Sequence, residues 1–175
     1  MSQLTLSALL PARARVAHER VPRASRRQLG ALRLVRETRF PAPDGYPDAQ
    51  GTPIRSPRDA WQLLAPYAAR ETAEVFWILP LDAQHRTPGP IEITRGILNA
   101  SLVHPREVFR AAIVAGAAAV ILAHQHPSGD PTPSSADRDI TEQLAAAGRL
   151  LDIPVHDHVI IGAGRYASFA EAGLL

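Results

Sequence analysis

The fold is decided by residues 117–137, whose sequence is AAAVILAHQHPSGDPTPSSAD. The apolar run over 117–123 predicts a buried β-strand, because uninterrupted apolar runs of this length are typical of strands covered on both faces. Residues 127–133 are rich in proline and other turn formers, so we expect the chain to turn back after the strand. Ser134 is a good N-cap for a helix that we expect to extend to Gly148. Polar side chains therefore gather where the strand ends and the helix begins.

Three of these polar side chains form a candidate metal site. His124 and His126 lie two residues apart at the end of the strand, so both imidazoles project to the same side. Two such nitrogens supply two corners of a tetrahedral zinc site, and Asp137 is the candidate third ligand. Each feature alone has an ordinary structural explanation, such as the capping-box pattern of Ser134 and Asp137. Their combination within fourteen residues favours a metal site.

The flanking sequence predicts a mixed β-sheet flanked by helices. The segment Ser56-Pro57-Arg58-Asp59 is a typical helix start, with a capping serine, an early proline and an early acid. The apolar run over 74–81 predicts a second buried strand, with Pro80 at an edge or a bulge. The other expected elements are strands over 91–98, 155–161 and 166–169 and a helix from His104 to about Gly116. This order predicts an α+β fold with α/β-like layers.

The first forty residues differ in charge from the rest of the chain. They contain nine arginines against two glutamates, a formal charge of +7, whereas the other 135 residues contain ten arginines against fifteen acids. We expect residues 1–45 to be an arginine-rich extension and linker, partly disordered, before a folded domain over residues 46–175. A basic arm over residues 1–40 is typical of a tether for nucleic acid or an acidic partner, and a solvated tail without a partner is an equal alternative.

Composition and motifs exclude several classes of protein. Cysteine is absent, which excludes disulfides and thiolate metal sites, and lysine is absent, which excludes a P-loop. No apolar run reaches the ~20 residues of a membrane helix and no secretory signal is evident, so we expect a cytoplasmic protein without membrane contact. The chain is too short for an amidohydrolase barrel and has no His-Glu-x-x-His helix. The residues after His126 do not follow the pattern of metallo-β-lactamase-type nucleases.

The spacing His124-x-His126-Pro127, followed by Ser134 and Asp137, resembles the JAMM motif of MPN/JAB-domain metalloproteases. The resemblance is specific to the RadC branch and covers about residues 54–175. Its further blocks are LNASLVHPRE at 98–107, DHVIIG at 157–162 and YASF at 166–169. It implies a JAB/MPN fold of the cytidine-deaminase-like type.

The sequence departs from the RadC pattern at two places. Gln125 stands where the branch commonly has asparagine. Residues 1–40 do not resemble the helix-hairpin-helix region of full-length RadC proteins, so we expect a short form with the JAB domain alone. A DNA-related role that the family name suggests therefore lacks its usual support.

The resemblance implies a zinc ion held by His124, His126 and Asp137, with a bound water whose pKa falls toward neutrality. It also implies a glutamate as general base at the start of a core strand, some tens of residues before the histidine pair. Glu74, 50 residues before His124, fits that position. The alternative is Glu107, 17 residues before His124, whose ordinary role would be to stabilise the first turn of its helix.

Other polar residues have smaller expected roles. Ser134 would donate a hydrogen bond to the developing oxyanion or orient the water, in addition to capping its helix. His156 and His158 flank Asp157 on the last long strand. We expect them to be strand residues with ordinary hydrogen bonds, and a contact with a ligand histidine is the alternative. His18, His85 and His104 are expected at the surface, in a turn and at a helix start.

The function implied by the resemblance is that of a zinc-dependent metallopeptidase or isopeptidase of the JAMM type. Such an enzyme cleaves a peptide or isopeptide bond through a metal-activated water, and its partner is a peptide or isopeptide-linked protein substrate. One alternative is a catalytically silent JAB scaffold. Another is a DNA-repair-associated module that binds DNA or protein, for which the arginines of residues 1–40 are the support in the sequence.

Overall fold

The computed structural model describes residues 48–96 and 103–175. The expected arginine-rich extension and linker over residues 1–45 lies outside these residues. So does the end of the strand expected over 91–98, which in the described part of the chain ends at Arg95.

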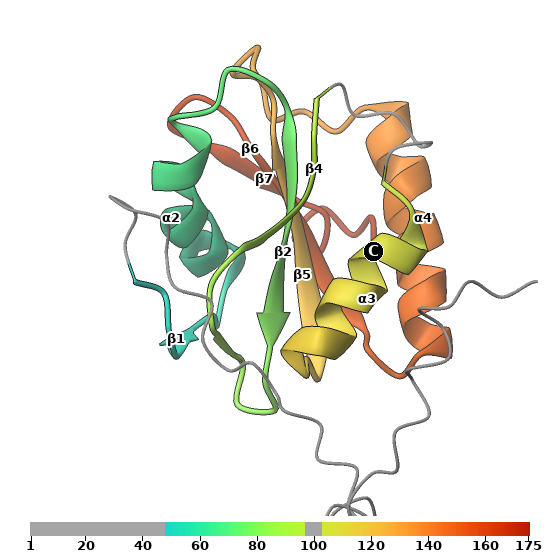
Figure 1. Cartoon of the computed structure of the whole chain (residues 1–175). Helices are drawn as coiled ribbons and strands as arrows, with labels where there is room; N and C mark the ends of the chain where they lie inside the picture. The colour runs from blue at the N-terminus through green and yellow to red at the C-terminus, as the bar shows by residue number, and fades with distance from the viewer. Residues whose placement is uncertain (1–47, 97–102) are drawn as a thin grey trace, which may run out of the picture. The chain divides into compact units, whose positions relative to one another are not determined.

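A five-stranded mixed sheet forms the centre of the described region (Figure 1). Its order is β4-β2-β5-β6-β7, and all neighbouring strands are antiparallel except β5 and β6. The strands are β2 (Val75–Leu81), β4 (Ile91–Arg95), β5 (Ala119–Gln125), β6 (Val155–Ile161) and β7 (Tyr166–Ser168). Every residue of β2 and of β5 is buried, which agrees with their continuous apolar sequence.

Helices cover both faces of this sheet. On one side lies α2 (Pro57–Ala68), and on the other lie α3 (Pro105–Ala115) and α4 (Ser135–Leu150) (Figure 1). The core divides accordingly, because alternate residues of a strand point to opposite faces. Trp77 and Leu79 of β2 belong to the apolar cluster under α2, whereas Phe76 and Ile78 belong to the cluster under α3 and α4. The expected α+β fold with a mixed sheet between helices is confirmed.

The helices begin where the sequence predicts. Ser56 caps α2 and accepts a hydrogen bond from the Asp59 N–H, and Ser134 caps α4 in the same way through the Asp137 N–H. His104 caps α3 with its ring nitrogen, and α3 ends at Gly116 in the left-handed conformation that favours glycine. Gly148 lets α4 pack closely, since a Cβ there would lie 2.6 Å from the carbonyl oxygen of Ile153.

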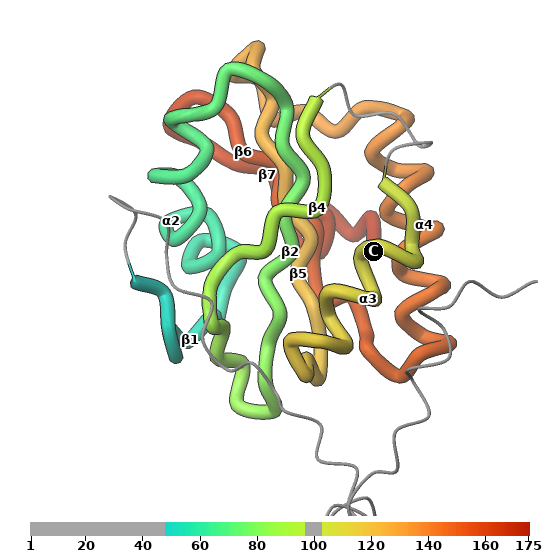
Figure 2. The backbone as a smooth tube through the Cα atoms, in the orientation of Figure 1, coloured from blue at the N-terminus to red at the C-terminus, as the bar shows by residue number. Residues whose placement is uncertain are grey.

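The strand pairing brings segments that are distant in the sequence together at one end of the inner strands β2 and β5. Because β2 and β5 are antiparallel, with Phe76 opposite His124, the residue before β2 lies beside the end of β5. The helix α4 begins after the turn that follows β5 and carries the chain across to the parallel strand β6. Figure 2 shows this path, with β4, β2 and β5 running side by side between α2 and α3. The start of β2, the end of β5 and the start of α4 therefore meet.

One pair of strands differs from the expected elements. The described residues contain a small antiparallel pair that is not among the expected strands, β1 (Thr52–Pro53) with β3 (Arg86–Thr87), each only two residues long. The pairing is non-local, so neither segment shows a strand pattern of its own.

Pro80 lies beyond Ile78, the last β2 residue paired with β4, so its lack of an N–H removes no bond to that strand. No helix in the described residues is long and apolar enough to cross a membrane.

Candidate metal centre

Four side chains with metal-binding atoms converge where the start of β2, the end of β5 and the start of α4 meet. Glu74 directly precedes β2, His124 lies in β5, His126 follows β5, and Asp137 lies in the first turn of α4. One ligand atom from each of these residues lies within 4.8 Å of those of the other three. Among residues 48–96 and 103–175, no other group of three or more histidine, cysteine or acidic side chains has this arrangement.

The Nε2 atom of His124 is the central atom of the group. It lies 3.0 Å from His126 Nε2, 3.2 Å from Asp137 Oδ1 and 3.6 Å from Glu74 Oε1. His124 and Asp137 are buried, while Glu74 and His126 are partly exposed, so the group is open on one side. Two imidazole nitrogens and carboxylate oxygens directed to one point are a donor set suited to a divalent metal ion, and zinc is among the metals that it fits.

Asp137 combines a structural role with its place in the centre. Its Oδ2 accepts hydrogen bonds from the Ser134 N–H at 2.8 Å and from the Ser134 hydroxyl at 2.6 Å, which completes a capping box. Burial works against ionisation of this carboxyl. The hydrogen bonds with His124 and His126 outweigh burial and hold the pKa of Asp137 far below its usual range. Asp137 is therefore an anionic group at the start of α4, where the helix dipole favours it.

His126 is oriented by the turn that follows it. Its Nδ1 lies 2.6 Å from the carbonyl oxygen of Asp130, which can only accept, so Nδ1 carries the proton and Nε2 faces Asp137 Oδ2 at 3.5 Å. The hydrogen bond with Asp137 raises the pKa of His126, against the opposing effect of burial. This turn packs tightly against the β6–β7 turn. A Cβ at Gly162 would lie 2.5 Å from the carbonyl oxygen of Gly129.

A buried pair of polar residues, Thr141 and His158, lies behind His124. His158 Nε2 is 2.8 Å from His124 Nδ1, and His158 Nδ1 is 2.5 Å from Thr141 Oγ1. Burial holds the pKa of His158 well below its usual value. The two strand histidines thus differ. His158 contacts His124, which is the alternative that the sequence left open, whereas His156 stacks on His85 with ring centroids 5.4 Å apart.

The backbone around Glu74 is held by Gln125. The Val75 N–H donates to Gln125 Oε1 at 2.8 Å, and Gln125 Nε2 donates to the carbonyl oxygen of Ala73. The roles of Gln125 and Thr141 are not predicted by the sequence. The role of Gln125 depends on the pairing of β2 with β5, which the local sequence does not indicate. Thr141 is one turn after Asp137 on α4, a spacing that places both on one face of the helix.

The other predicted site residues lie as follows. Ser134 stands beside the group, with its hydroxyl bonded to Asp137. Glu107, the alternative general base, does not belong to the converging group and instead pairs with Arg110 at 2.6 Å and with Arg106 at 3.1 Å on the outer face of α3. The hydrogen bond with Arg106 lowers the pKa of Glu107.

A pocket of about 330 Å³ adjoins the metal centre at His126. It lies between α2 and the two turns that follow β5 and β6. Trp61 and Ile161 line it together with Glu71 and several small residues, namely Ala65, Ala68, Ala69, Gly129, Gly162, Ala163 and Gly164. The pocket is thus mostly apolar and has His126, one of the four converging residues, in its wall.

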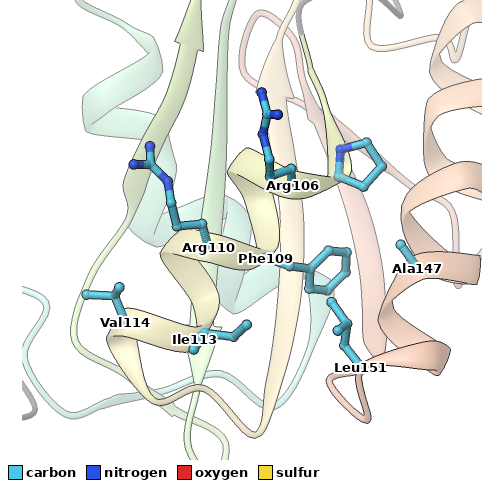
Figure 3. Close-up of a pocket in the computed structure, with 8 residues that line it drawn as sticks. Arg106, Phe109, Arg110, Ile113, Val114, Ala147 and Leu151 are labelled. Carbon is cyan, nitrogen blue, oxygen red and sulfur yellow. The ribbon is translucent and has the colours of Figure 1, made fainter. Parts of the chain in front are cut away.

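A second pocket, of about 440 Å³, lies between α3 and the end of α4 (Figure 3). Phe109 points toward Leu151 across it, while Arg106 and Arg110 extend away along α3. None of the four converging residues lines this pocket.

Comparison with known proteins finds relatives of most of the described region. The profile of the RadC-like JAB domain matches residues 54–174. A UPF0758 protein of Symbiobacterium thermophilum, STH371, is 48% identical over 132 residues, which cover 73% of this chain and 56% of that protein. A UPF0758 protein of Methanosarcina mazei is 44% identical over 122 residues, covering 70% of this chain and 53% of the relative. The chain spans about half the length of the curated relatives it matches.

Proposed function

The chain belongs to the family of RadC-like JAB domains, and on that premise we propose that it is a zinc-dependent hydrolase that cleaves a peptide or isopeptide bond. The observation that carries the proposal is the convergence of Glu74 with His124, His126 and Asp137 from three separate segments of the chain. The two histidines and Asp137 are the residues that would hold the metal. A structural site would use all four groups as ligands, whereas a catalytic site keeps a position open for water.

The metal would supply Lewis-acid chemistry, which lowers the pKa of a water and polarises the carbonyl of the scissile bond. Zinc suits the combination of imidazole and carboxylate ligands found here.

Glu74 is the proposed residue that transfers a proton from the attacking water to the leaving amine. Its Oε1 lies 3.6 Å from His124 Nε2 and its side chain is partly exposed, so it borders the open side of the group. A carboxylate in this position accepts a proton from the attacking water and passes it to the leaving amine, which makes it a general base and then a general acid. Glu107 is engaged with two arginines on the outer face of α3 and is not proposed for this step.

Ser134 has two proposed roles, which are to orient the carboxylate of Asp137 and to stabilise the oxyanion. Its hydroxyl donates to Asp137 Oδ2 and its backbone N–H donates to the same oxygen, so it fixes the orientation of the carboxylate. We propose that the same hydroxyl reorients toward the oxyanion as negative charge develops there.

The pocket beside His126 is the proposed binding site for the substrate next to the scissile bond. Its small residues give room for a peptide segment, and its apolar wall at Trp61 and Ile161 favours an apolar side chain. The identity of the substrate protein is not implied by these residues.

Zinc analysis together with a hydrolysis assay tests the proposed function. We expect about one zinc per wild-type chain after reconstitution and little in Asp137→Ala, with Asp139→Ala as a matched control on the exposed face of α4. The zinc-loaded wild type should cleave members of a library of peptides and isopeptides. A protein that retains no zinc would contradict the proposal and leave a binding module with a JAB fold.

The arginines of residues 1–40 support a second proposal, which is that this segment binds nucleic acid. Nine arginines against two glutamates favour contacts with phosphates. The full chain should bind duplex DNA with an affinity that falls steeply with salt, and replacement of Arg13, Arg15, Arg26 and Arg27 by glutamine should weaken binding and reduce that salt dependence. Binding that is unchanged in this variant would count against the arm.

A further inference from the structure

Thr141 and His158 connect the ring of His124 to the backbone of α4. Thr141 Oγ1 lies 2.5 Å from the carbonyl oxygen of Asp137 and 2.5 Å from His158 Nδ1. His158 Nε2 lies 2.8 Å from His124 Nδ1. We propose that Thr141 and His158 are positioning residues that keep a proton on Nδ1 of His124, so that Nε2, which faces Asp137, is the ring nitrogen available to a metal.

The direction of the first hydrogen bond follows from its acceptor. The carbonyl oxygen of Asp137 carries no proton, so at 2.5 Å the hydroxyl of Thr141 must donate to it. The hydroxyl has a single proton, and its oxygen therefore faces His158 Nδ1 with a lone pair. The contact between Thr141 and His158 then requires a proton on His158 Nδ1.

The surroundings of His158 determine whether its other ring nitrogen, Nε2, carries a proton. The side chain is fully buried, stacks on Phe169 with centroids 4.9 Å apart and packs edge-to-face with Phe76 with centroids 5.6 Å apart. Such an apolar environment favours the neutral imidazole, which has one ring proton only. Because that proton is on Nδ1, Nε2 is an acceptor and the hydrogen bond to His124 is donated by His124 Nδ1.

This arrangement matters for metal affinity because His124 Nε2 is the central atom of the candidate centre. A neutral histidine can bind a metal through Nε2 only when its proton is on Nδ1. Ligand histidines usually donate their second N–H to a carboxylate or carbonyl, and loss of such a partner weakens metal binding about 10- to 100-fold. Here the partner is a neutral histidine that is itself fixed by a threonine. The effect on affinity rests on the proposed metal centre, whereas the proton positions do not.

Nitrogen-15 NMR of the histidine rings in the metal-free full chain measures the proton positions. We expect protons on Nδ1 of both His124 and His158, with Nε2 of His158 unprotonated. In Thr141→Val, His158 Nδ1 loses its acceptor, so the proton should move to Nε2 and donate to His124 Nδ1. Thr141→Ser, which keeps the hydroxyl, should retain the wild-type pattern. A wild-type His158 protonated on Nε2 would overturn the proposal.

Zinc affinity, measured by competition with a chromophoric chelator, provides the second test. Thr141→Val should bind zinc about 10-fold or more weakly, and Thr141→Ser should bind within about threefold of wild type. His156→Gln is the matched control, since His156 is on the same strand and contacts His85 instead of His124. Thermal unfolding followed by circular dichroism shows whether each variant is folded.

The outcomes separate the two proposals. A folded Thr141→Val that binds zinc as tightly as wild type overturns the role of Thr141 and His158, even if the protein is a zinc hydrolase. A wild type that binds no zinc overturns the proposed function and the effect on affinity, and the NMR measurement still decides the proton positions.

Discussion

Gln125 accepts a hydrogen bond from the backbone N–H of Val75 at 2.8 Å, through Oε1 of its buried side chain. Its Nε2 donates to the carbonyl oxygen of Ala73, so one amide group binds both neighbours of Glu74. Backbone pairing between β2 and β5 starts at Phe76 opposite His124. The side chain of Gln125 therefore extends the contact between these strands to the residue that carries the proposed general base.

Replacement of Gln125 should disturb Glu74 and leave the metal ligands in place. Gln125→Leu removes the acceptor of the Val75 N–H in a buried position, which costs about 1–3 kcal/mol of stability. We expect faster hydrogen exchange of the Val75 amide and a lower kcat, with zinc affinity unchanged. Gln125→Asn retains both polar groups on a shorter side chain and should have a smaller effect. Unchanged exchange at Val75 in Gln125→Leu would show that the hydrogen bond does not hold this backbone.

Glu74→Gln should separate metal binding from hydrolysis. The amide cannot accept the proton of the attacking water, and general acid–base catalysis typically contributes about 100- to 10,000-fold to the rate. We expect zinc content equal to that of wild type and a loss of kcat in this range, measured on a peptide or isopeptide substrate of the wild type. Glu107→Gln is the control, because Glu107 pairs with arginines on α3 and should retain activity. Full activity of Glu74→Gln would require another base.

Much of the centre follows from local sequence. The apolar run before His124 and the serine that caps α4 specify strand and helix independently of the rest of the chain, so the positions of His124 and Asp137 could be predicted. Glu74 was harder to assign, because its place beside His124 depends on the antiparallel pairing of β2 with β5. The preference for Glu74 over Glu107 rests on the resemblance to the JAMM pattern, which indicates a glutamate at the start of a core strand.

Contacts that depend on tertiary packing could not be predicted from local patterns. The hydrogen bonds of Gln125 join residues about fifty positions apart, and the link from His158 to Thr141 needs the parallel pairing of β6 with β5 under α4. The pair β1 and β3 is too short for a strand pattern. Register and packing decide such contacts, and a single sequence carries little information about either.

The contact between His126 and Asp137 predicts opposite pH effects on folding and on metal binding. Their hydrogen bond raises the pKa of His126, so its contribution to the stability of the metal-free protein is present below about pH 6.5 and is lost as pH rises through the raised value. The lowered pKa of Asp137, which the histidines hold down against burial, gives a contribution that is present above about pH 4 and lost on acidification. Zinc affinity should rise with pH, because the ligands must lose their protons.

Thermal unfolding of the metal-free protein between about pH 5 and 9 measures the first effect. The Tm of wild type should decrease as pH rises past neutrality, and the decrease should be smaller in His126→Gln, which cannot titrate. An equal pH dependence in both proteins would mean that other groups cause it.

The pocket beside His126 predicts a variant that changes substrate binding alone. Ala65 lines the pocket from α2, so Ala65→Leu fills space in the pocket and replaces none of the four converging residues. Leucine is a good helix former, and α2 should therefore keep its structure. For substrates with a large apolar residue beside the scissile bond we expect a higher KM with little change in kcat, because the lost contacts are the same in the ground state and in the transition state.

Substrates with glycine at that position should be affected less by Ala65→Leu, and the zinc content of this variant should equal that of wild type. Ala146→Leu, on the exposed face of α4, controls for added apolar surface. If both variants show wild-type KM values for every substrate, the peptide does not enter this pocket and must approach the metal centre from the side of Glu74.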